Sequence, residues 1–359
     1  MSDAAMREAL SLLARGEPIG RDRITAAMRE LIAGACDPAQ IGALLMGLAA
    51  RREHIDEIVG AAIAMREASI PVPSTRVDLL DTCGTGGSGI ARRNVSTAVA
   101  IAVSACGVAV AKHGNRAASS TSGSADVLEL LGVDLGAPPE TVGASIDAHG
   151  IGFCFAPALH PAMKHAAGVR RALGFRTLFN LLGPLCNPAR ATRQLLGVYD
   201  PSRCRDLAAA LGQLGSTRVL VVHGFLAGVS AEDGARAGID DLSCEGETLV
   251  WQWHRGELSR RVLRPADAEL PEVPIADLAG EDPLRNAEAL LRVLDGDPGP
   301  YRTAVQYGGA LALVAAGEGD FADLPAHARR IAAVLDDGSA RSRLADLVAK
   351  SHDRPRADP

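Results

Sequence analysis

The sequence predicts an α/β protein with a separate all-α domain: a small N-terminal helical domain, then a larger α/β domain with a mostly parallel central sheet flanked by helices. Three observations predict this. From Met1 to about Ile70, apolar residues recur at spacings of three and four, without strand-like alternation. Pro71–Thr75 is a proline-punctuated linker. Beyond it, short β-branched or aliphatic runs alternate with helical segments, which indicates a parallel sheet.

The helical domain is expected over residues 1–72. Within it, Asp37–Gln40 has the pattern of a helix start, with an aspartate cap, a proline at the first position and a glutamine that can reach back to the cap. It predicts a helix over Ile41–Ala50, and a second helix follows over about Ile55–Glu67.

The α/β domain is expected over residues 73–350. A strand, a glycine-rich turn, a helix stopped by Gly107 and a second strand form its first unit, which implies parallel strands. The predicted strands are Val77–Leu80, Val108–Ala111, Val219–Val222 and Leu249–Trp253, and the predicted helix is Val95–Ala105. Residues 351–359 are polar and proline-broken, so we expect a disordered tail there.

Composition excludes several classes of protein. The chain has 359 residues, enough for about two domains. Its 47% hydrophobic and 22% charged residues exclude a disordered or fibrous chain, and 3% aromatics predict an aliphatic, alanine-rich core. A net charge of -6 argues against a main role in binding nucleic acid or an anionic membrane, but leaves a local anion site open.

The cysteine pattern and the N-terminal residues predict a cytoplasmic protein. The seven cysteines are scattered and match neither a disulfide framework nor a zinc site. The N-terminus carries acids where a signal peptide would carry bases. The longest apolar run, Ala98–Ala111, is shorter than the ~20 residues that span a bilayer, so no membrane partner is expected.

The first group of residues with functional chemistry is the glycine-rich turn Asp81–Gly89. Four glycines in six positions let backbone N–H groups approach an anion, and the helix that follows adds its N-terminal dipole. A glycine cluster alone is more often a tight connection, and this one matches neither the dinucleotide fingerprint nor the Walker loop. Asn94–Thr97 adds polar side chains at the helix start, expected to point into the same space.

A second group follows the next strand. Lys112–Arg116 (Lys-His-Gly-Asn-Arg) is followed by the hydroxyl-rich run Ser119–Ser124. Because open α/β sheets bind ligands at the carboxyl ends of their strands, a phosphorylated ligand is favoured over a solvated loop with a helix cap at Ser124.

The sequence resembles the anthranilate phosphoribosyltransferase family over nearly its whole length. Together the shared motifs are specific, although each alone would be weak. They are the Gly-Thr-Gly-Gly loop with Asn-x-Ser-Thr, Lys112–Arg116, Ser124–Glu129, Phe155-Ala-Pro, His160–His165, Val169-Arg170, Arg176–Leu185 and Asn187–Ala189.

The resemblance implies transfer of a phosphoribosyl group from phosphoribosyl pyrophosphate (PRPP) to the amine of anthranilate, with Mg²⁺-pyrophosphate leaving. Such a reaction needs charge neutralisation and positioning above all. The chain positions that match the family's PRPP site are Gly84, Thr85, Gly86, Gly87, Ser88, Asn94, Val95, Ser96, Thr97, Lys112, His113, Gly114 and Ser124.

Metal, acceptor and assembly also follow from the resemblance. Asp240 and Asp241 match the family's metal motif and, with Ser96, would hold Mg²⁺, for which one or two carboxylates plus substrate phosphates suffice. A bare acid pair is otherwise usually an exposed turn. The anthranilate positions would be Gly84, Asn115, His160 and Arg170, whose guanidinium suits a carboxylate. No catalytic proton-transfer residue is assigned. A homodimer through the helical domain is expected, and residues of about 160–185 should pack on that domain.

The chain departs from the family pattern at several positions. Ser88 replaces an acid of the loop, Arg92 and Arg93 replace a threonine and an aromatic residue, and Gly308 replaces a common asparagine. Residues 225–237 form an insertion that a surface loop would tolerate. Two positive charges at the mouth of the site suggest tighter phosphate binding. These changes bear on the acceptor and on metal dependence more than on the phosphoribosyl half.

Two alternatives stay open. One is a paralogue that uses another aromatic amine, which would still carry a carboxylate if Arg170 is used. The other is a non-catalytic homologue that binds nucleic acid, although the acidic balance and the scarcity of aromatics speak against it. Pyrimidine nucleoside phosphorylases share the fold, but are not expected to combine Asn115, Arg170 and the pair Asp240-Asp241.

Overall fold

The computed structural model describes residues 3–117, 122–232 and 236–354. Its helices are α1 (Ala4–Ala14), α2 (Arg21–Ile32), α3 (Pro38–Arg51), α4 (Ile55–Glu67), α5 (Val95–Ala105), α6 (Ser124–Leu130), α7 (Pro139–His149), α8 (Ala156–Leu159), α9 (Lys164–Leu173), α10 (Leu178–Leu182), α11 (Cys204–Gln213), α12 (Pro283–Leu294), α13 (Pro300–Ala315), α14 (Leu324–Asp336) and α15 (Ser339–Ser351). Its strands are β1 (Leu80–Gly84), β2 (Val110–Gly114), β3 (Ile151–Phe155), β4 (Arg193–Gly197), β5 (Arg218–Phe225), β6 (Gly238–Ile239), β7 (Thr248–His254) and β8 (Glu257–Leu263).

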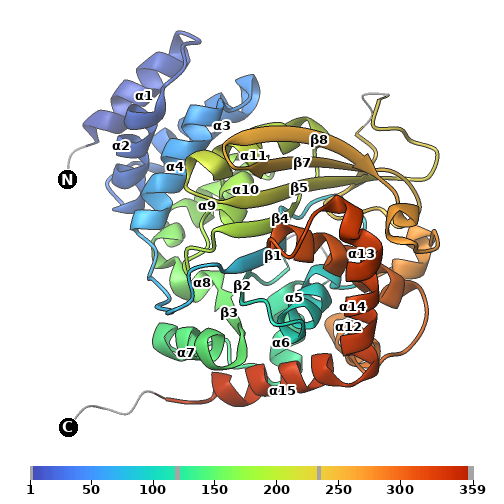
Figure 1. The fold of residues 1–359 in the computed structure, drawn as a ribbon. Helices are drawn as coiled ribbons and strands as arrows, with labels where there is room; N and C mark the ends of the chain where they lie inside the picture. The colour runs from blue at the N-terminus through green and yellow to red at the C-terminus, as the bar shows by residue number, and fades with distance from the viewer. Residues whose placement is uncertain (1–2, 118–121, 233–235, 355–359) are drawn as a thin grey trace.

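The strands form one mixed sheet in the order β3-β2-β1-β4-β5-β7-β8, with β6 paired to β5. The five strands from β3 to β5 are parallel, and β6, β7 and β8 add antiparallel pairs beside them. The predicted mostly parallel sheet is therefore confirmed. Since β1 lies between β2 and β4, the loops that follow these three strands meet at one edge of the sheet (Figure 1).

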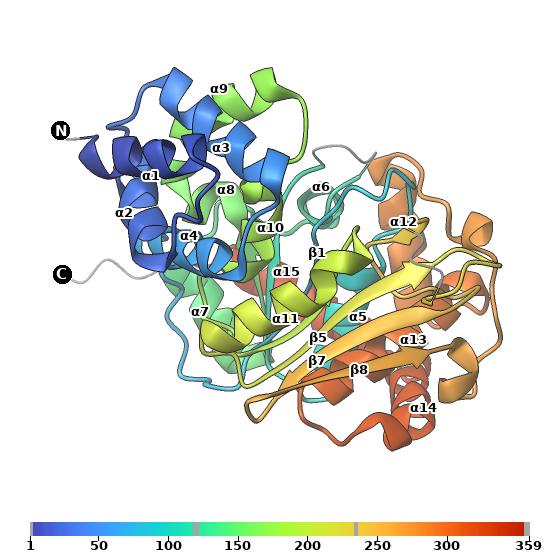
Figure 2. The same ribbon diagram turned by 90° about the horizontal axis from the view of Figure 1, so that it is seen from above.

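Successive residues of the central strands face two different apolar cores. In β5, Leu220 and Val222 belong to the core under α5, α12, α13, α14 and α15, whereas Val219 and Val221 face the core that contains the helical bundle and α11. This alternation is the period of two that a strand imposes. Both layers are visible in Figures 1 and 2, with α12, α13 and α14 on one side of the sheet and α11 on the other.

The first four helices form the expected N-terminal bundle. Asp37 caps α3 by accepting a hydrogen bond from the backbone N–H of Ala39, and Gln40 reaches back to Asp37, so the predicted capping box is present. Helices α9 and α10, far along the chain, contact α3 and share the bundle's apolar core (Figure 2). The bundle is thereby joined to the segment that carries part of the site.

The predicted boundaries of the first two strands were wrong by two to four residues. The first strand begins at Leu80 rather than Val77, whose side chain is 79% exposed, and the second begins at Val110. Both strands continue through buried polar residues that the apolar pattern treated as turn. Those residues stay in the sheet because they have partners: the backbone N–H of His113 donates to Asp81 Oδ1.

The C-terminal segment is held further along than expected. Residue Ser351 ends α15, and its hydroxyl accepts a hydrogen bond from the backbone N–H of Asp134. The carbonyl of Asp353 accepts a hydrogen bond from Thr141. Residues 351–354 are therefore not part of a disordered tail, and residues 355–359 lie outside the described residues. None of the helices in the described ranges has both the length and the apolarity that a bilayer crossing requires.

Candidate active site

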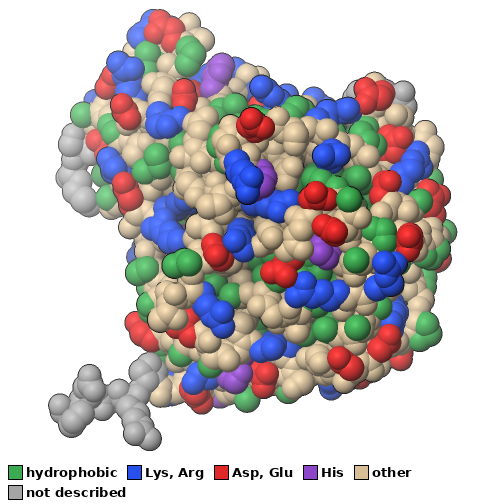
Figure 3. Space-filling view, in the orientation of Figure 1, with side chains coloured by type: hydrophobic (Ala, Val, Ile, Leu, Met, Phe, Trp, Pro, Cys, Tyr) green, Lys and Arg blue, Asp and Glu red, His purple; other side chains and the backbone are tan. Residues whose placement is uncertain are grey.

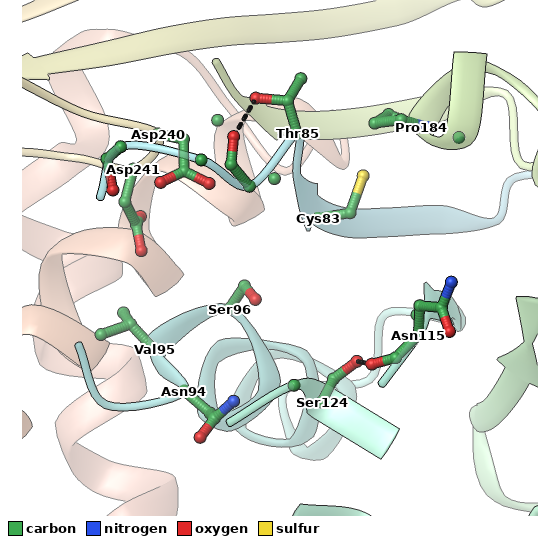
Figure 4. Close-up of a pocket in the computed structure, with 18 of the residues that line it drawn as sticks. Cys83, Thr85, Asn94, Val95, Ser96, Asn115, Ser124, Pro184, Asp240 and Asp241 are labelled. Atoms are coloured by element: carbon green, nitrogen blue, oxygen red, sulfur yellow. Dashed lines mark hydrogen bonds between the residues drawn. The ribbon is translucent and has the colours of Figure 1, made fainter. Parts of the chain in front are cut away.

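A cavity of about 540 Å³ opens at the carboxyl ends of β1, β2 and β4. This is within the size range of small-molecule sites. It is lined by the glycine-rich loop, the start of α5, the end of β2, the turn after β6 and residues of α9 and α10 (Figure 4). All of the residues predicted to bind PRPP, anthranilate or metal line it except Thr97 and His160.

The glycine-rich loop leaves β1 at Gly84 and turns back toward α5. Gly86 and Gly87 have positive φ values of 70° and 93°, a conformation that residues with a Cβ rarely adopt. The loop is anchored by the N–H of Thr85 to the Gly197 carbonyl, and Arg176 donates to the carbonyls of Gly86 and Gly87. With its carbonyls engaged, the loop is shaped to offer N–H groups to an anion.

The start of α5 contributes the next group of donors. Asn94 is the N-cap residue, and Asn94, Val95 and Ser96 line the cavity. Thr97 does not: it is buried, and its hydroxyl has no hydrogen-bond partner among the residues that the structure describes. The helix rotation places consecutive side chains about 100° apart, so four residues in a row cannot all face one cavity.

Lys112 reaches the cavity from β2. Its Nζ donates to the Thr82 carbonyl at 2.7 Å and lies 3.5 Å from Ser96 Oγ. Burial lowers the pKa of Lys112, and the nearby carboxylate of Asp81 opposes that shift. Burial also raises the pKa of Asp81, which is fully buried. Each of these two charges therefore stabilises the ionised form of the other beneath the loop.

The acid pair Asp240-Asp241 follows β6 and lies directly over the ends of β1 and β4. Glycines make this approach feasible, because a Cβ on Gly197 would lie 2.0 Å from the Asp240 carbonyl oxygen. Arg92 is paired with both acids, at 2.8 Å from Asp240 Oδ1 and 3.3 Å from Asp241 Oδ2. Burial raises the pKa of Asp241, and the Arg92 charge opposes that rise.

The two additional arginines of the loop therefore have different surroundings. Arg92 pairs with the acids, whereas the Arg93 guanidinium lies 5.6 Å from the centre of the Tyr301 ring. Both line the cavity. Both arginines lie at the cavity as expected, but Arg92 is already paired with Asp240 and Asp241, nearly 150 residues further along the chain.

The opposite end of the cavity carries Asn115 and Arg170. In Figure 4, Asn115 and Pro184 lie on the same side of the pocket, opposite the acid pair. The Arg170 guanidinium lies 5.2 Å from the centre of the Phe179 ring, and no carboxylate among the described residues is within ion-pair distance of it. Burial lowers its pKa, and it remains available for an anionic ligand.

Two buried histidines lie at the base of this end. The ring centres of His113 and His160 are 5.2 Å apart, and within the described ranges neither Nε2 atom has a hydrogen-bond partner. Burial lowers the pKa of His113 to about 3 and that of His160 to about 4, so both are neutral at physiological pH. His113 lines the cavity, whereas His160 lies behind it. Next to them, Ser124 Oγ lies 3.5 Å from the Asn115 carbonyl.

The side chains that line this cavity carry an excess of positive charge, unlike those on the face shown in Figure 3. Six cationic side chains line it, against two acids, an excess of four positive charges within the described residues: Arg92, Arg93, Lys112, Arg116, Arg170 and Arg176 against Asp240 and Asp241. On the face shown in Figure 3, Lys and Arg are instead interspersed with Asp and Glu. The cavity is therefore suited to a polyanion, although the chain as a whole is acidic.

Several lining residues were absent from the predicted site. Arg176 holds the loop and lies over the Tyr199 ring at 3.8 Å, and Phe179 and Asn180 come from α10. Arg176, Phe179 and Asn180 all belong to Arg176–Leu185, one of the motifs shared with the family, so that motif was the sequence signal that could have identified them. Gly308 also lines the cavity, where a Cβ would lie 2.8 Å from Val99, so an asparagine there would displace α5 or α13.

The residues near the acid pair fit a hard cation with a phosphate partner. Two carboxylates and the Ser96 hydroxyl open into the same cavity as the loop. In the described ranges, no three His, Cys, Asp or Glu side chains gather as a metal site. A closed protein cage is therefore not formed by the described residues, which agrees with a metal such as Mg²⁺ that keeps substrate phosphates and waters as ligands.

The fold and this cavity define a transferase of the two-domain glycosyl transferase type. The helical bundle domain of that family matches residues 7–69, and its α/β domain matches residues 76–341. A curated anthranilate phosphoribosyltransferase from Methylocella silvestris is 46% identical over 97% of this chain and 96% of that protein. Another from Rhodopseudomonas palustris is 44% identical over 95% and 97%.

Solved structures agree. Anthranilate phosphoribosyltransferase from Thermus thermophilus is 42% identical, with a TM-score of 0.87, over 96% of this chain and 100% of that one. The enzyme from Saccharomyces cerevisiae in complex with PRPP and Mg is 26% identical, with a TM-score of 0.85, over 98% of both. The chain belongs to the anthranilate phosphoribosyltransferase family.

Proposed function

We propose that this chain transfers the 5-phosphoribosyl group of PRPP to the amine of anthranilate and releases pyrophosphate. The observation that carries this proposal is the cavity itself, which is lined by anion donors, an acid pair and Arg170, an arginine that has no acid partner among the described residues. Such a set serves a reaction that needs charge neutralisation at one end and positioning of a carboxylate-bearing amine at the other. The names of the full-length relatives point to the same reaction.

The phosphoribosyl half would bind at the glycine-rich loop. Backbone N–H groups of 84–87, together with Asn94, Ser96 and Lys112, offer donors and one cation to the phosphates. Because these donors are fixed before the reaction, they would stabilise the charge that develops on the departing pyrophosphate. Lys112 is suited to this because its hydrogen bond to the Thr82 carbonyl holds the ammonium in place.

Asp240, Asp241 and Ser96 would hold Mg²⁺ together with the pyrophosphate. The donor set supports this, because Mg²⁺ is usually bound by one or two carboxylates plus substrate phosphates and water. When bound, the ion neutralises charge on the leaving group. Removal of a carboxylate should therefore raise the Mg²⁺ concentration that turnover requires, which Asp240→Asn tests in a titration of Mg²⁺ at fixed PRPP.

The acceptor half would be the end with Asn115 and Arg170. Arg170 would pair with the anthranilate carboxylate, since a guanidinium forms two parallel hydrogen bonds to a carboxylate and no protein acid of the described chain competes for it. The amine nitrogen then bonds to the anomeric carbon as the bond to pyrophosphate oxygen breaks, and the nitrogen releases one proton. No side chain is assigned to accept it.

Loss of anthranilate fluorescence in the presence of PRPP and Mg²⁺ tests the proposal. We expect a steady decrease that needs all three components. A folded protein that gives no turnover overturns the assigned activity. Turnover with another carboxylated aromatic amine, and not with anthranilate, would instead identify the paralogue that the sequence left open.

The expected assembly and location stay predictions. Two copies would associate through the helical domain, where Met46 of α3 is 49% exposed. Light scattering after gel filtration should then give twice the 37.1 kDa chain mass, and a monomer at micromolar concentration would contradict it. A cytoplasmic location is checked by cell fractionation.

A further inference from the structure

Arg92 lies between the two acids that the proposed function assigns to Mg²⁺. Its Nη2 is 2.8 Å from Asp240 Oδ1 and its Nη1 is 3.3 Å from Asp241 Oδ2. The side chains of Arg92 and Asp240 are each 11% exposed, and that of Asp241 is 21% exposed. This is a largely buried ion pair in which one guanidinium uses an oxygen of each carboxylate.

The backbone around Arg92 is fixed, so this placement is built into the fold. Arg92 forms an isolated bridge with Ala279, and the N–H of Gly280 donates to the Ala91 carbonyl. A Cβ on Gly280 would lie 2.5 Å from the Arg92 carbonyl oxygen, so only glycine allows the two segments to lie this close. The N–H of Arg93 donates to the Leu278 carbonyl. The loop position is therefore set by contacts remote from the cavity.

Within the described residues, these two acids are the only carboxylates that line the cavity. Ser88 provides none from the loop, where an acid was expected from the family pattern. With Arg92 in place, the acid pair carries one net negative charge instead of two. A divalent cation and a guanidinium compete for the same oxygens, because each carboxylate is already an acceptor for Arg92.

We propose that Arg92 is an internal counter-ion that closes the acid pair in the free protein, so that a divalent cation enters only together with pyrophosphate. The inference rests on the proposed function. Pyrophosphate provides a new anionic partner for the guanidinium, which moves from the carboxylates to the phosphate oxygens as the metal takes its place. A planar guanidinium binds phosphate as readily as carboxylate, so the exchange leaves Arg92 paired in both states. Arg92 is thus a positioning residue for the metal.

Neighbouring residues make the inference testable. Arg93 has the same charge, is adjacent in sequence and lines the same cavity, but it lies over the Tyr301 ring and pairs with no acid in the described part of the chain. Arg93→Gln is therefore a matched control for Arg92→Gln, since both remove one positive charge from the cavity. Combining Arg92→Gln with Asp240→Asn tests whether any new metal binding uses the acid pair.

The experiment is equilibrium dialysis of full-length protein against Mn²⁺ alone and against Mn²⁺ with inorganic pyrophosphate. We expect weak Mn²⁺ binding by the unaltered protein and by Arg93→Gln without pyrophosphate. Arg92→Gln should bind Mn²⁺ alone about tenfold or more tightly, because it removes a charge-assisted hydrogen bond from each acid. The double variant should lose this gain. With pyrophosphate present, the unaltered protein should bind Mn²⁺ as tightly as Arg92→Gln or more tightly.

Three results overturn the inference: equal Mn²⁺ affinity of the unaltered protein and Arg92→Gln without pyrophosphate, the same gain in Arg93→Gln, or no Mn²⁺ binding by the unaltered protein even with pyrophosphate. The last result would mean that Arg92 replaces the metal. Circular dichroism of each variant excludes unfolding as the cause. The proposed function is judged separately by anthranilate turnover, so a protein that turns over normally while Arg92→Gln leaves Mn²⁺ affinity unchanged refutes only the counter-ion role.

Discussion

Gly197 lines the cavity, and a single methyl group there should impair catalysis by displacing the turn that carries the acid pair. It ends β4, and a Cβ there would lie 2.0 Å from the Asp240 carbonyl oxygen. Real Cβ contacts essentially never fall below 3.0 Å, so Gly197→Ala must separate the two by about 1 Å. Gly197 pairs with Gly84 on one side and Val222 on the other. Because the strand is held from both sides, we expect the turn with the acid pair to move.

The magnitude follows from the size of that movement. A displacement of about 1 Å at groups that position a reacting complex lowers the rate by roughly 10²-fold. This corresponds to about 2.7 kcal/mol of transition-state stabilisation. The loss should appear in kcat and in the Mg²⁺ concentration needed for half-maximal rate. The KM for anthranilate should change much less, because Arg170 comes from α9, at another part of the cavity.

Steady-state kinetics of Gly197→Ala, with a Mg²⁺ titration, checks this. Gly309→Ala is the matched control, because its Cβ would lie 2.6 Å from Ile331 in the core and Gly309 does not line the cavity. That control should lower the melting temperature and leave kcat per folded molecule unchanged. A folded Gly197→Ala with a kcat within a few-fold of the unaltered protein would refute the reasoning, as would an equal loss of kcat in Gly309→Ala.

Three further predictions concern the acceptor, the domain junction and pH. Arg170→Ala should raise the KM for anthranilate by roughly 10- to 100-fold, the value of a charged hydrogen bond, and that for PRPP far less; equal effects on both would contradict the pocket assignment. Glu53 and Arg203 form an ion pair in which both side chains are less than 10% exposed. Glu53→Gln removes the negative charge that compensates the buried Arg203, so it should lower the free energy of unfolding in urea by about 3 kcal/mol. In the folded protein, burial lowers the pKa of His113 to about 3 and that of His160 to about 4, against 6.5 ordinarily. Between the lowered pKa and pH 6.5, each histidine therefore binds a proton in the unfolded chain but not in the folded one. The free energy of unfolding should therefore fall on acidification below pH 6.5, by about 1.4 kcal/mol per pH unit for each histidine down to about pH 4, and His160→Gln should remove about half of that slope.

Apolar periodicity was enough to predict the helical bundle, α5 and the parallel order of the first strands. It was insufficient where buried polar residues continue a strand. Asp81 and Lys112 look like turn residues by pattern, yet each lies in a strand because a partner on a neighbouring segment satisfies it. The antiparallel strand β8 was not predicted, because most of its residues are exposed and its apolar residues, Leu258, Val262 and Leu263, do not alternate regularly. Strand ends therefore depend on hydrogen-bond partners that only the folded chain supplies.

The candidate site, too, could be predicted only in part from the sequence. Motifs near in sequence predicted the loop, the start of α5 and the end of β2 as one region, and these residues do line one cavity. The local sequence did not show which distant residue each charged side chain contacts. Arg92 was expected to face phosphate, but its partners come from the turn after β6. Arg176 holds the glycine loop from a segment that follows α9. Both pairings are set by tertiary packing.

The two halves of the cavity come from different parts of the fold, and this has a consequence for catalysis. Donors for phosphate lie on loops of the sheet, whereas Arg170 lies on α9, which packs on the helical bundle. An apolar core shared by the bundle, α10, α11 and the sheet joins these parts, and the buried pair of Glu53 and Arg203 crosses the same junction. With the substrates bound as proposed, the distance between the anomeric carbon and the acceptor amine would therefore be set by domain packing. A change at this junction should lower kcat through misalignment even where both substrates still bind.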